Sequence, residues 1–329
     1  MDFQWTLFFQ FVIIGLATGS LVALVALGYT LVYGIIELIN FAHGEVFMMG
    51  AFFTAMVITL TGVTSEDAVV AIVAVMLLGL VAGMAFSAGL NRGIDWIAYR
   101  RLRNAPRLAP LIAAIGVSFI LQNLAIYWRG PNPFTAPDLV PFDWRTYNVL
   151  QEWPFLRDWF EGSTLRLGLM DLFVIGVTIP LLGGMSWFVY RTRIGTAMRA
   201  TAQDREAAAL MGIDINRTIG VAFVLGGALA GAAGMIALLY NNSARFNMGF
   251  QYGLYAFTAA VLGGIGNLAG AVVGGLLIGL IWSFSDGFMA LYIDGWGSHW
   301  TNTVIFSILV LVLVFKPSGI FGEHATEKV

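Results

Sequence analysis

Long uninterrupted apolar runs restrict the fold of this sequence more than any other feature. The run from Ala71 to Leu90, AIVAVMLLGLVAGMAFSAGL, is apolar on every face of a helix and is long enough to cross a hydrocarbon core of about 30 Å. Strands of a membrane barrel alternate apolar and polar side chains, and this run does not. The chain is 59% hydrophobic and only 11% charged. We therefore predict an all-α integral membrane protein.

Nine apolar stretches predict a polytopic bundle of eight or nine transmembrane helices. They fall at 8–38, 46–61, 69–91, 111–128, 169–190, 218–240, 253–266, 270–292 and 301–316. The N-terminal MDFQWTLFFQ has no basic region typical of a cleaved signal peptide, so we expect the first stretch to remain as a span. We expect a single transmembrane domain over residues 1–329. The sequence has no cysteine and no basic tract, which argues against a thiolate metal site and against nucleic acid as a ligand.

Two arginine-rich connections indicate the orientation of the chain. One contains Arg92, Arg100, Arg101, Arg103 and Arg107, and the other, at 191–217, contains Arg191, Arg193, Arg199, Arg205 and Arg217. Because Lys and Arg accumulate on the cytoplasmic side of a membrane, we expect both connections to be cytoplasmic. The connection at 129–168 then lies on the periplasmic side. Its many prolines and aromatic residues fit either a segment at the headgroup level or a docking rim for an outside partner.

Two places within the apolar runs predict broken or re-entrant segments. One is the glycine-rich GGIGNLAG around Asn267, and the other is the stretch containing Asn40 and Gly44. Each glycine weakens a helix by about 1 kcal/mol relative to alanine. Non-helical backbone at membrane depth is tolerated only where it is buried in protein or lines a wet cavity, so we expect both breaks to face inward. Paired breaks of this kind are typical of a transport pathway.

The stretch YGIIELINFAHGEVFMMGAFF places Glu37, Asn40, His43 and Glu45 inside an apolar run. A charged side chain at the bilayer centre costs roughly 2.5–3.5 kcal/mol on insertion scales, so these groups need partners, water or an interfacial location. We expect them near the cytoplasmic face, either as a satisfied turn or, together with Asn267, as a polar gate of the pathway. The spacing of His43 and Glu45 does not match the H-E-x-x-H of metalloproteases, so we predict neither a catalytic residue nor a metal site.

The connection at 191–217 predicts a short helix outside the membrane. Thr201 and Asp204 have the spacing of a capping box, and Gly212 is suited to end the helix in a left-handed conformation. Between them, Ala207, Leu210 and Met211 fall at i, i+3 and i+4 and form an apolar stripe on a helix about 15 Å long. This helix is either packed against the bundle or a lever for a cytoplasmic partner.

The segment EAAALMG, from Glu206 to Gly212, resembles the E-A-A-x-x-x-G signature of permease subunits of ATP-binding-cassette (ABC) importers. In that family the segment is the coupling helix, which docks into a groove of the ATPase subunit. The resemblance implies a role in ATPase coupling for Glu206, Ala207, Ala208 and Gly212, and we add the neighbouring Arg205.

Three longer blocks extend the resemblance over nearly the whole chain. The segments Ala26 to Ala51, Ala209 to Ile236 and Phe257 to Leu280 are similar to the LivH-type permease subunits of branched-chain amino acid importers, within the hydrophobic amino acid uptake family. This resemblance implies the ABC importer permease fold in a bacterial inner membrane. It also implies a second related permease subunit, two cytoplasmic ATP-binding subunits and a periplasmic substrate-binding protein as partners.

The alternatives differ in substrate and in the source of energy. Relatives in this class carry urea, amides or other amino acids, and an unrelated alternative is a self-sufficient secondary transporter or channel. The sequence has no G-x-x-x-x-G-K-[ST] loop, so we expect partner subunits to use ATP and this chain to bind no cofactor and to be no enzyme. No span presents a pair of opposite charges for an amino acid, and we therefore expect no tight substrate site here.

Overall fold

The computed structural model describes residues 3–36, 40–103, 105–106, 108–153 and 165–322. Seven helices in this part of the chain are long and apolar enough to cross a membrane. They are built on α1 (Phe3–Ile36), α2 (His43–Thr61), α3 (Val69–Ile94), α4 (Leu108–Arg129), α8 (Leu169–Arg191), α11 (Ile215–Asn241) and α13 (Leu268–Ser283). Two shorter helices, α12 (Met248–Gly263) and α15 (Ser298–Phe315), correspond to the remaining two predicted apolar stretches. Each of the nine predicted apolar stretches is therefore a helix, and the prediction of an all-α polytopic membrane protein is confirmed.

Short irregular pieces extend two of the long helices. Helix α3 continues through a π-helical turn, η1 (Asp95–Tyr99), and a 3-10 turn, η2 (Arg100–Leu102), while α13 continues through η3 (Phe284–Met289) into α14 (Ala290–Tyr292). The buried Asp95 forms ion pairs with Arg92 and Arg103. These pairs hold the extension of α3 against the connection that follows it.

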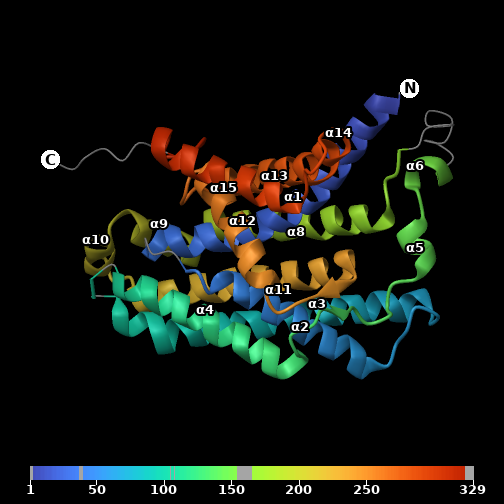
Figure 1. Cartoon of the computed structure of the whole chain (residues 1–329). Helices are drawn as coiled ribbons and strands as arrows, with labels where there is room; N and C mark the ends of the chain where they lie inside the picture. Colours follow the sequence, from blue (N-terminus) through green and yellow to red (C-terminus); the bar gives the residue numbers. More distant parts are fainter. Residues whose placement is uncertain (1–2, 37–39, 104, 107, 154–164, 323–329) are drawn as a thin grey trace.

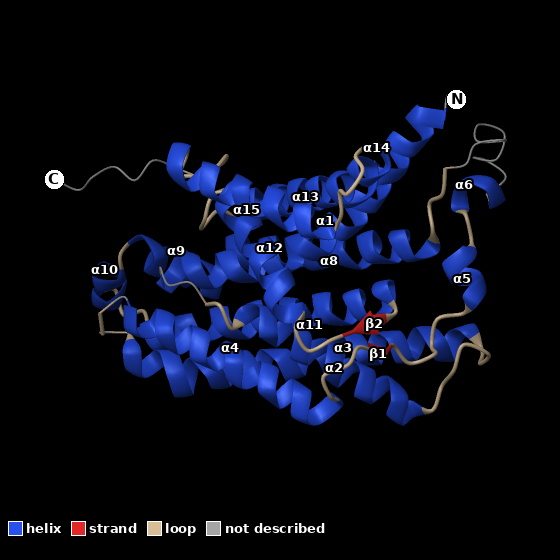
Figure 2. Ribbon diagram, viewed as in Figure 1, coloured by secondary structure: helices blue, strands red, loops and turns tan. Residues whose placement is uncertain are grey.

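The connections between the long helices gather at the two ends of the bundle (Figure 1). One end carries α9 (Arg193–Gln203) and α10 (Arg205–Leu210), and the opposite end carries α5 (Phe142–Thr146) and α6 (Val149–Glu152). We refer to them as the α10 end and the α5 end. Among the described residues the only sheet is a short antiparallel pair of β1 (Phe134–Thr135) and β2 (Ser243–Ala244), which joins the connection after α4 to the end of α11 (Figure 2).

Glycines allow the central helices to approach one another at backbone distance. A Cβ atom added to Gly279 of α13 would lie 2.2 Å from the Cα of Gly19 in α1, and one added to Gly231 of α11 would lie 2.3 Å from the carbonyl oxygen of Gly83 in α3. No larger residue fits at either position. Helices in lipid associate through such close van der Waals contact, so these glycines serve packing within the chain.

The break near Asn267 is present as predicted. Helix α12 ends at Gly263 and α13 begins at Leu268, with Gly264 and Gly266 at positive φ of 104° and 93°. The side-chain oxygen of Asn267 accepts a hydrogen bond from the backbone of Gly270 at 2.9 Å and caps α13. Its amide nitrogen donates to the carbonyl of Phe321 at 3.0 Å, so the same residue also holds the segment after α15.

The first break is present too, but Gly44 does not form it. Helix α1 ends at Ile36 and α2 begins at His43, so Gly44 lies in the first turn of α2. A Cβ atom on Gly44 would lie 2.2 Å from the carbonyl oxygen of Gly249 in α12. The prediction that Gly44 interrupts a helix was therefore wrong: this glycine allows α2 and α12 to touch.

Candidate functional site

The α10 end presents a short, firmly capped helix. Asp204 has an extended backbone between α9 and α10, and its carboxylate accepts hydrogen bonds from the backbone of Glu206 and Ala207 at 2.9 and 3.0 Å. At the other end of α10, Gly212 has a φ of +83°, and the backbone of Ile213 donates to the carbonyl of Ala208 at 3.1 Å. Both termini of α10 are thus satisfied by local bonds, as an isolated turn of helix requires.

The predicted helix boundary at Thr201 was wrong. Thr201 lies inside α9, is 1% exposed, and donates its hydroxyl proton to the carbonyl of Ala197. Asp204, expected within the first turn, is itself the N-cap. Helix α10 consequently has six residues and a length of about 9 Å, shorter than the helix predicted from 201 to 212.

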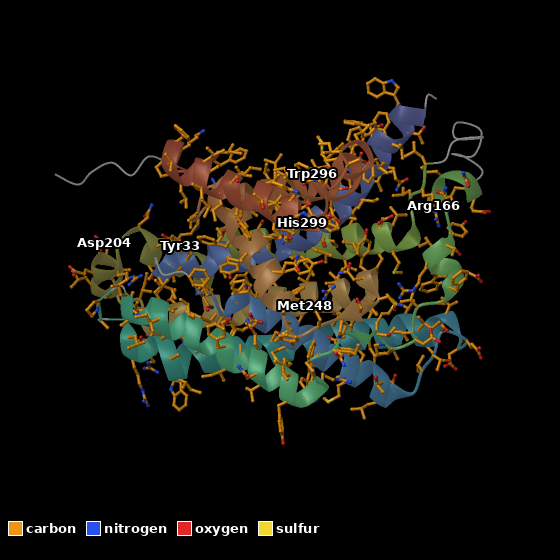
Figure 3. The ribbon with its side chains drawn as sticks, in the orientation of Figure 1. Tyr33, Arg166, Asp204, Met248, Trp296 and His299 are labelled. Atoms are coloured by element: carbon orange, nitrogen blue, oxygen red, sulfur yellow. The ribbon has the colours of Figure 1, made fainter. Side chains whose placement is uncertain are left out.

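Helix α10 turns one face outward and one toward α1. Leu210 and Met211 are 89% and 85% exposed, whereas Ala208 is buried. Arg205 points inward, and its guanidinium donates through Nε and Nη2 to the carbonyl oxygen of Ile35 at 3.2 and 2.8 Å. Ile35 is in the last described turn of α1, so Arg205 joins α10 to this part of α1. Figure 3 shows Tyr33 of α1 and Asp204 at the same end of the bundle.

Asn40 organises the turn that leads into α2. Its side-chain oxygen accepts hydrogen bonds from the hydroxyl of Tyr99 at 2.7 Å and from the backbone of Ala42 at 3.1 Å. Its carbonyl accepts from the backbone of His43 at 3.0 Å. Asn40 is 4% exposed, so this turn is buried, as expected for broken backbone in a membrane protein. Glu37, which we predicted to belong to the same group, lies outside the described residues.

His43 is fully buried between α1 and α11. Its ring meets Tyr29 edge to face with centroids 4.7 Å apart, and a Cβ atom on Gly28 would lie 2.5 Å from Nε2. Neither ring nitrogen has a hydrogen-bond partner among the described residues. Buried polar groups normally have a hydrogen-bond partner, so His43 is an exception. Its position is fixed by packing against Tyr29 and Gly28.

Glu45 is fully buried and is held by α4. Its Oε1 accepts hydrogen bonds from Ser118 Oγ at 3.1 Å and Gln122 Nε2 at 2.8 Å, while Oε2 has no partner among the described residues. Ser118 and Gln122 lie about halfway along α4. Glu45 is therefore deeper than the position near the cytoplasmic face that the sequence predicted. Polar residues one turn apart in an apolar helix were a usable signal for this pair, which our sequence reasoning missed.

Two cavities lie on either side of this buried group along α1. One has a volume of about 310 Å³ and is lined by Thr18 and Val22 of α1 and by residues of α11, β2, α12 and α13. The other, about 120 Å³, reaches Thr30 of α1 and lies toward the α10 end, beside α9 and the break at Gly266. Tyr29, which packs on His43, lies on α1 between the two linings. Asn40, His43 and Glu45 thus form one buried group, whereas Asn267 contacts the segment after α15 instead.

These features define a class: a multi-pass helical membrane protein with paired helix breaks, a buried polar centre and a capped helix at one end. Residues 11–314 match the family described as branched-chain amino acid transport system / permease component. The chain therefore belongs to this family of permeases.

Individual relatives align with this chain over most or all of its length. The chain is 37% identical over 322 residues to the high-affinity branched-chain amino acid transport system permease protein BraD of Pseudomonas aeruginosa, covering 98% of each chain. It is 35% identical over 329 residues to the permease protein LivH of the corresponding system of Escherichia coli, covering 100% of each chain. A probable LivH of Methanocaldococcus jannaschii is 26% identical over 307 residues, covering 92% of this chain and 89% of the relative.

Proposed function

We propose that this chain is the permease subunit of an ABC importer that takes up branched-chain, hydrophobic amino acids across a bacterial inner membrane. The geometry of α10 carries the proposal. It is a capped helix with an exposed apolar tip, Leu210 and Met211, and a guanidinium, that of Arg205, bound to the end of α1. The substrate class is taken from the names of the full-length relatives.

Helix α10 acts as the coupling helix in this proposal. The exposed Leu210 and Met211 dock into a groove of an ATP-binding subunit, where burying each apolar side chain contributes about 1.5–3 kcal/mol. Movement of that subunit displaces α10. Because Arg205 holds the carbonyl of Ile35, the displacement passes to the end of α1 and to the adjoining turn at Asn40. Glu206 and Ala207 contribute to the outer face, and Gly212 ends the helix.

The remaining partners follow from the orientation. The arginine-rich α10 end faces the cytoplasm, where two ATP-binding subunits bind and hydrolyse ATP. The α5 end faces the periplasm and receives substrate from a binding protein. A second related permease subunit completes the membrane pore. This chain binds no cofactor and catalyses no reaction.

Asn40, His43 and Glu45 form the closed middle of the pathway in this proposal. The support is their place in the protein. All three are buried, and Gly44, between His43 and Glu45, makes the close contact of α2 with α12. His43 packs on the part of α1 that lies between the two cavities. Charge at this depth is costly and is typically retained for function. Asn267, at the break between α12 and α13, serves as a hinge.

Reconstitution tests the substrate and the class of transporter together. The complete importer, with its binding protein, is placed in proteoliposomes containing ATP, and uptake of leucine, isoleucine, valine, alanine, urea and acetamide is compared. We expect the three branched-chain amino acids to be taken up in preference to the others. Preferred uptake of urea or acetamide would assign a different substrate class.

Crosslinking tests the docking of α10. The chain has no native cysteine, so a single Leu210→Cys reports without background from this subunit. A thiol-specific photocrosslinker at this position should capture an ATP-binding subunit. The matched control is Glu66→Cys, an exposed position between α2 and α3, which should capture none. Capture of the same subunit from both positions, or from neither, argues against the assignment.

A further inference from the structure

The larger cavity combines features that suit a small zwitterion. Its volume of about 310 Å³ is at the lower end of the range for small-molecule sites. It begins beside β2 and reaches Thr18 and Val22, halfway along α1. Figure 3 labels Met248, one of its lining residues, in the middle of the bundle between Asp204 at one end and Arg166 at the other. The cavity therefore extends from β2 to the middle of α1.

The cavity lining includes polar groups with unused bonding capacity. Among the described residues, the guanidinium of Arg245 has neither a hydrogen-bond nor an ion-pair partner. The amide nitrogen of Asn241 donates to the hydroxyl of Tyr252 at 3.2 Å, and that of Gln251 donates to the hydroxyl of Tyr255 at 2.9 Å. Both amide oxygens are then left as acceptors directed by these bonds. The cavity thus offers one cation and several neutral acceptors.

Other residues of the cavity lining are apolar. Val22, Met248, Ile278 and Trp282 line it with branched, thioether and aromatic surface. Met248 and Ile278 are buried. An aliphatic side chain of four carbons fits such a surface without leaving a polar atom unsatisfied.

We propose that this cavity is a low-affinity site for a hydrophobic amino acid, with the carboxylate on Arg245 and the aliphatic side chain between Met248, Ile278 and Trp282. A guanidinium binds a carboxylate through two parallel hydrogen bonds. The ammonium group binds to the amide oxygens of Asn241 and Gln251. The proposal rests on the proposed function, and it adds the place in this chain where substrate released from the binding protein is first held.

Low affinity is consistent with the expectation that this chain has no tight site. Arg245 is exposed, and the ammonium meets only neutral groups, so neither end of the zwitterion gains the strength of a buried ion pair. We expect a Kd on the order of 1 mM, which allows substrate to leave inward as well as to bind.

Protection of a single cysteine measures occupancy directly. Ser243→Cys places a thiol in the cavity lining of a chain that has no other cysteine. The complete transporter, without binding protein and ATP, is reacted with a fluorescent maleimide, and labelling of this subunit is followed. For a Kd near 1 mM, about 10 mM leucine should slow labelling by the factor 1 + [L]/Kd, roughly tenfold. Leucinamide, which lacks the carboxylate, and glycine, which lacks the side chain, should protect much less.

Variants of the cation separate recognition from general effects. Arg245→Gln should abolish protection by leucine, and Arg245→Lys should retain part of it. The matched control Arg166→Gln removes a charge from the same end of the protein and should leave protection intact. Glu66→Cys, away from the cavity, should label at the same rate with and without leucine.

The outcomes separate this site from the proposed function. Equal protection by leucine and leucinamide would overturn the site. No protection by leucine would also overturn it, and this is the result expected if a lipid or detergent chain fills the cavity. ATP-driven uptake of leucine by the Ser243→Cys transporter is measured in parallel. Transport of leucine without protection of the cysteine would support the proposed function but reject the site. Protection without transport supports the site and counts against the proposed function.

Discussion

Replacing Glu45 with glutamine should reduce transport while leaving the protein folded. Glutamine keeps an oxygen where Oε1 accepts from Ser118 and Gln122, at 3.1 and 2.8 Å. It removes the negative charge from a fully buried position. The variant therefore tests the charge of Glu45 separately from its shape.

The expected change in stability is close to zero. A hydrogen bond to a charged group contributes about 1.5–3 kcal/mol, and one between neutral groups about 0.5–1.5 kcal/mol, so two bonds lose roughly 2–3 kcal/mol together. Removing a charge from membrane depth returns about 2.5–3.5 kcal/mol. The two terms offset each other to within about 1 kcal/mol. Glu45→Ala is different, since it leaves the hydroxyl donor of Ser118 unpaired and Gln122 with only its 3.5 Å bond to Ser118 Oγ. It should destabilise by about 2–5 kcal/mol.

The effect on transport comes from the weaker link between α2 and α4. If α2 and α4 separate in the open form while residue 45 stays at membrane depth, removing the charge favours both forms equally. Only the loss of about 2 kcal/mol in the two hydrogen bonds then counts, and the equilibrium between closed and open forms shifts about 30-fold. Substrate then leaks back, and leucine accumulation falls although ATP hydrolysis continues. The assay compares accumulation, hydrolysis and thermal midpoint for wild type, Glu45→Gln and Glu45→Ala. Wild-type accumulation by Glu45→Gln would refute a gating role for the charge.

Three further changes probe coupling, packing and capping. Arginine at Ala207 should preserve ATP hydrolysis but reduce ATP-driven uptake by about tenfold or more. Arginine at Glu66, the control, should leave both rates unchanged. Equal uptake by the two variants would count against coupling through α10. Gly44→Ala should destabilise the protein by about 1–3 kcal/mol because the added Cβ meets the backbone of α12. In the control Gly116→Ala the added Cβ meets no described atom within 4 Å, so the thermal midpoint should not fall. Equal thermal midpoints for the two variants would contradict the close contact of Gly44 with α12. Asn267→Ala removes a helix cap and should cost about 1 kcal/mol, which denaturation of the purified protein can measure; an unchanged curve would argue that the cap is dispensable.

Features that depend on local sequence could be predicted well. Length and apolarity identify helices, so all nine predicted apolar stretches correspond to helices, seven of which are long and apolar enough to cross a membrane among the described residues. The glycine cluster predicted the break at Gly264 and Gly266, and Gly212 predicted the end of α10; the structure has all three at positive φ. These signals act over a few residues and need no tertiary information.

Features that depend on contacts between distant segments could not be predicted. Thr201 and Asp204 are both good caps, and burial of Thr201 within α9 decides between them. The depth of Glu45 follows from Ser118 and Gln122, more than 70 residues away. The sequence placed Arg205 in the predicted coupling segment, but its contact with the carbonyl of Ile35 joins residues 170 apart and could not be predicted.

The source of energy is the most direct test of the account. Proteoliposomes carrying the complete importer are supplied with leucine outside and ATP inside, and the internal leucine concentration is followed. We predict accumulation above the outside concentration only with ATP and all partner subunits present. Accumulation by this chain alone, driven by a proton or sodium gradient without ATP, would contradict the account and identify a secondary transporter.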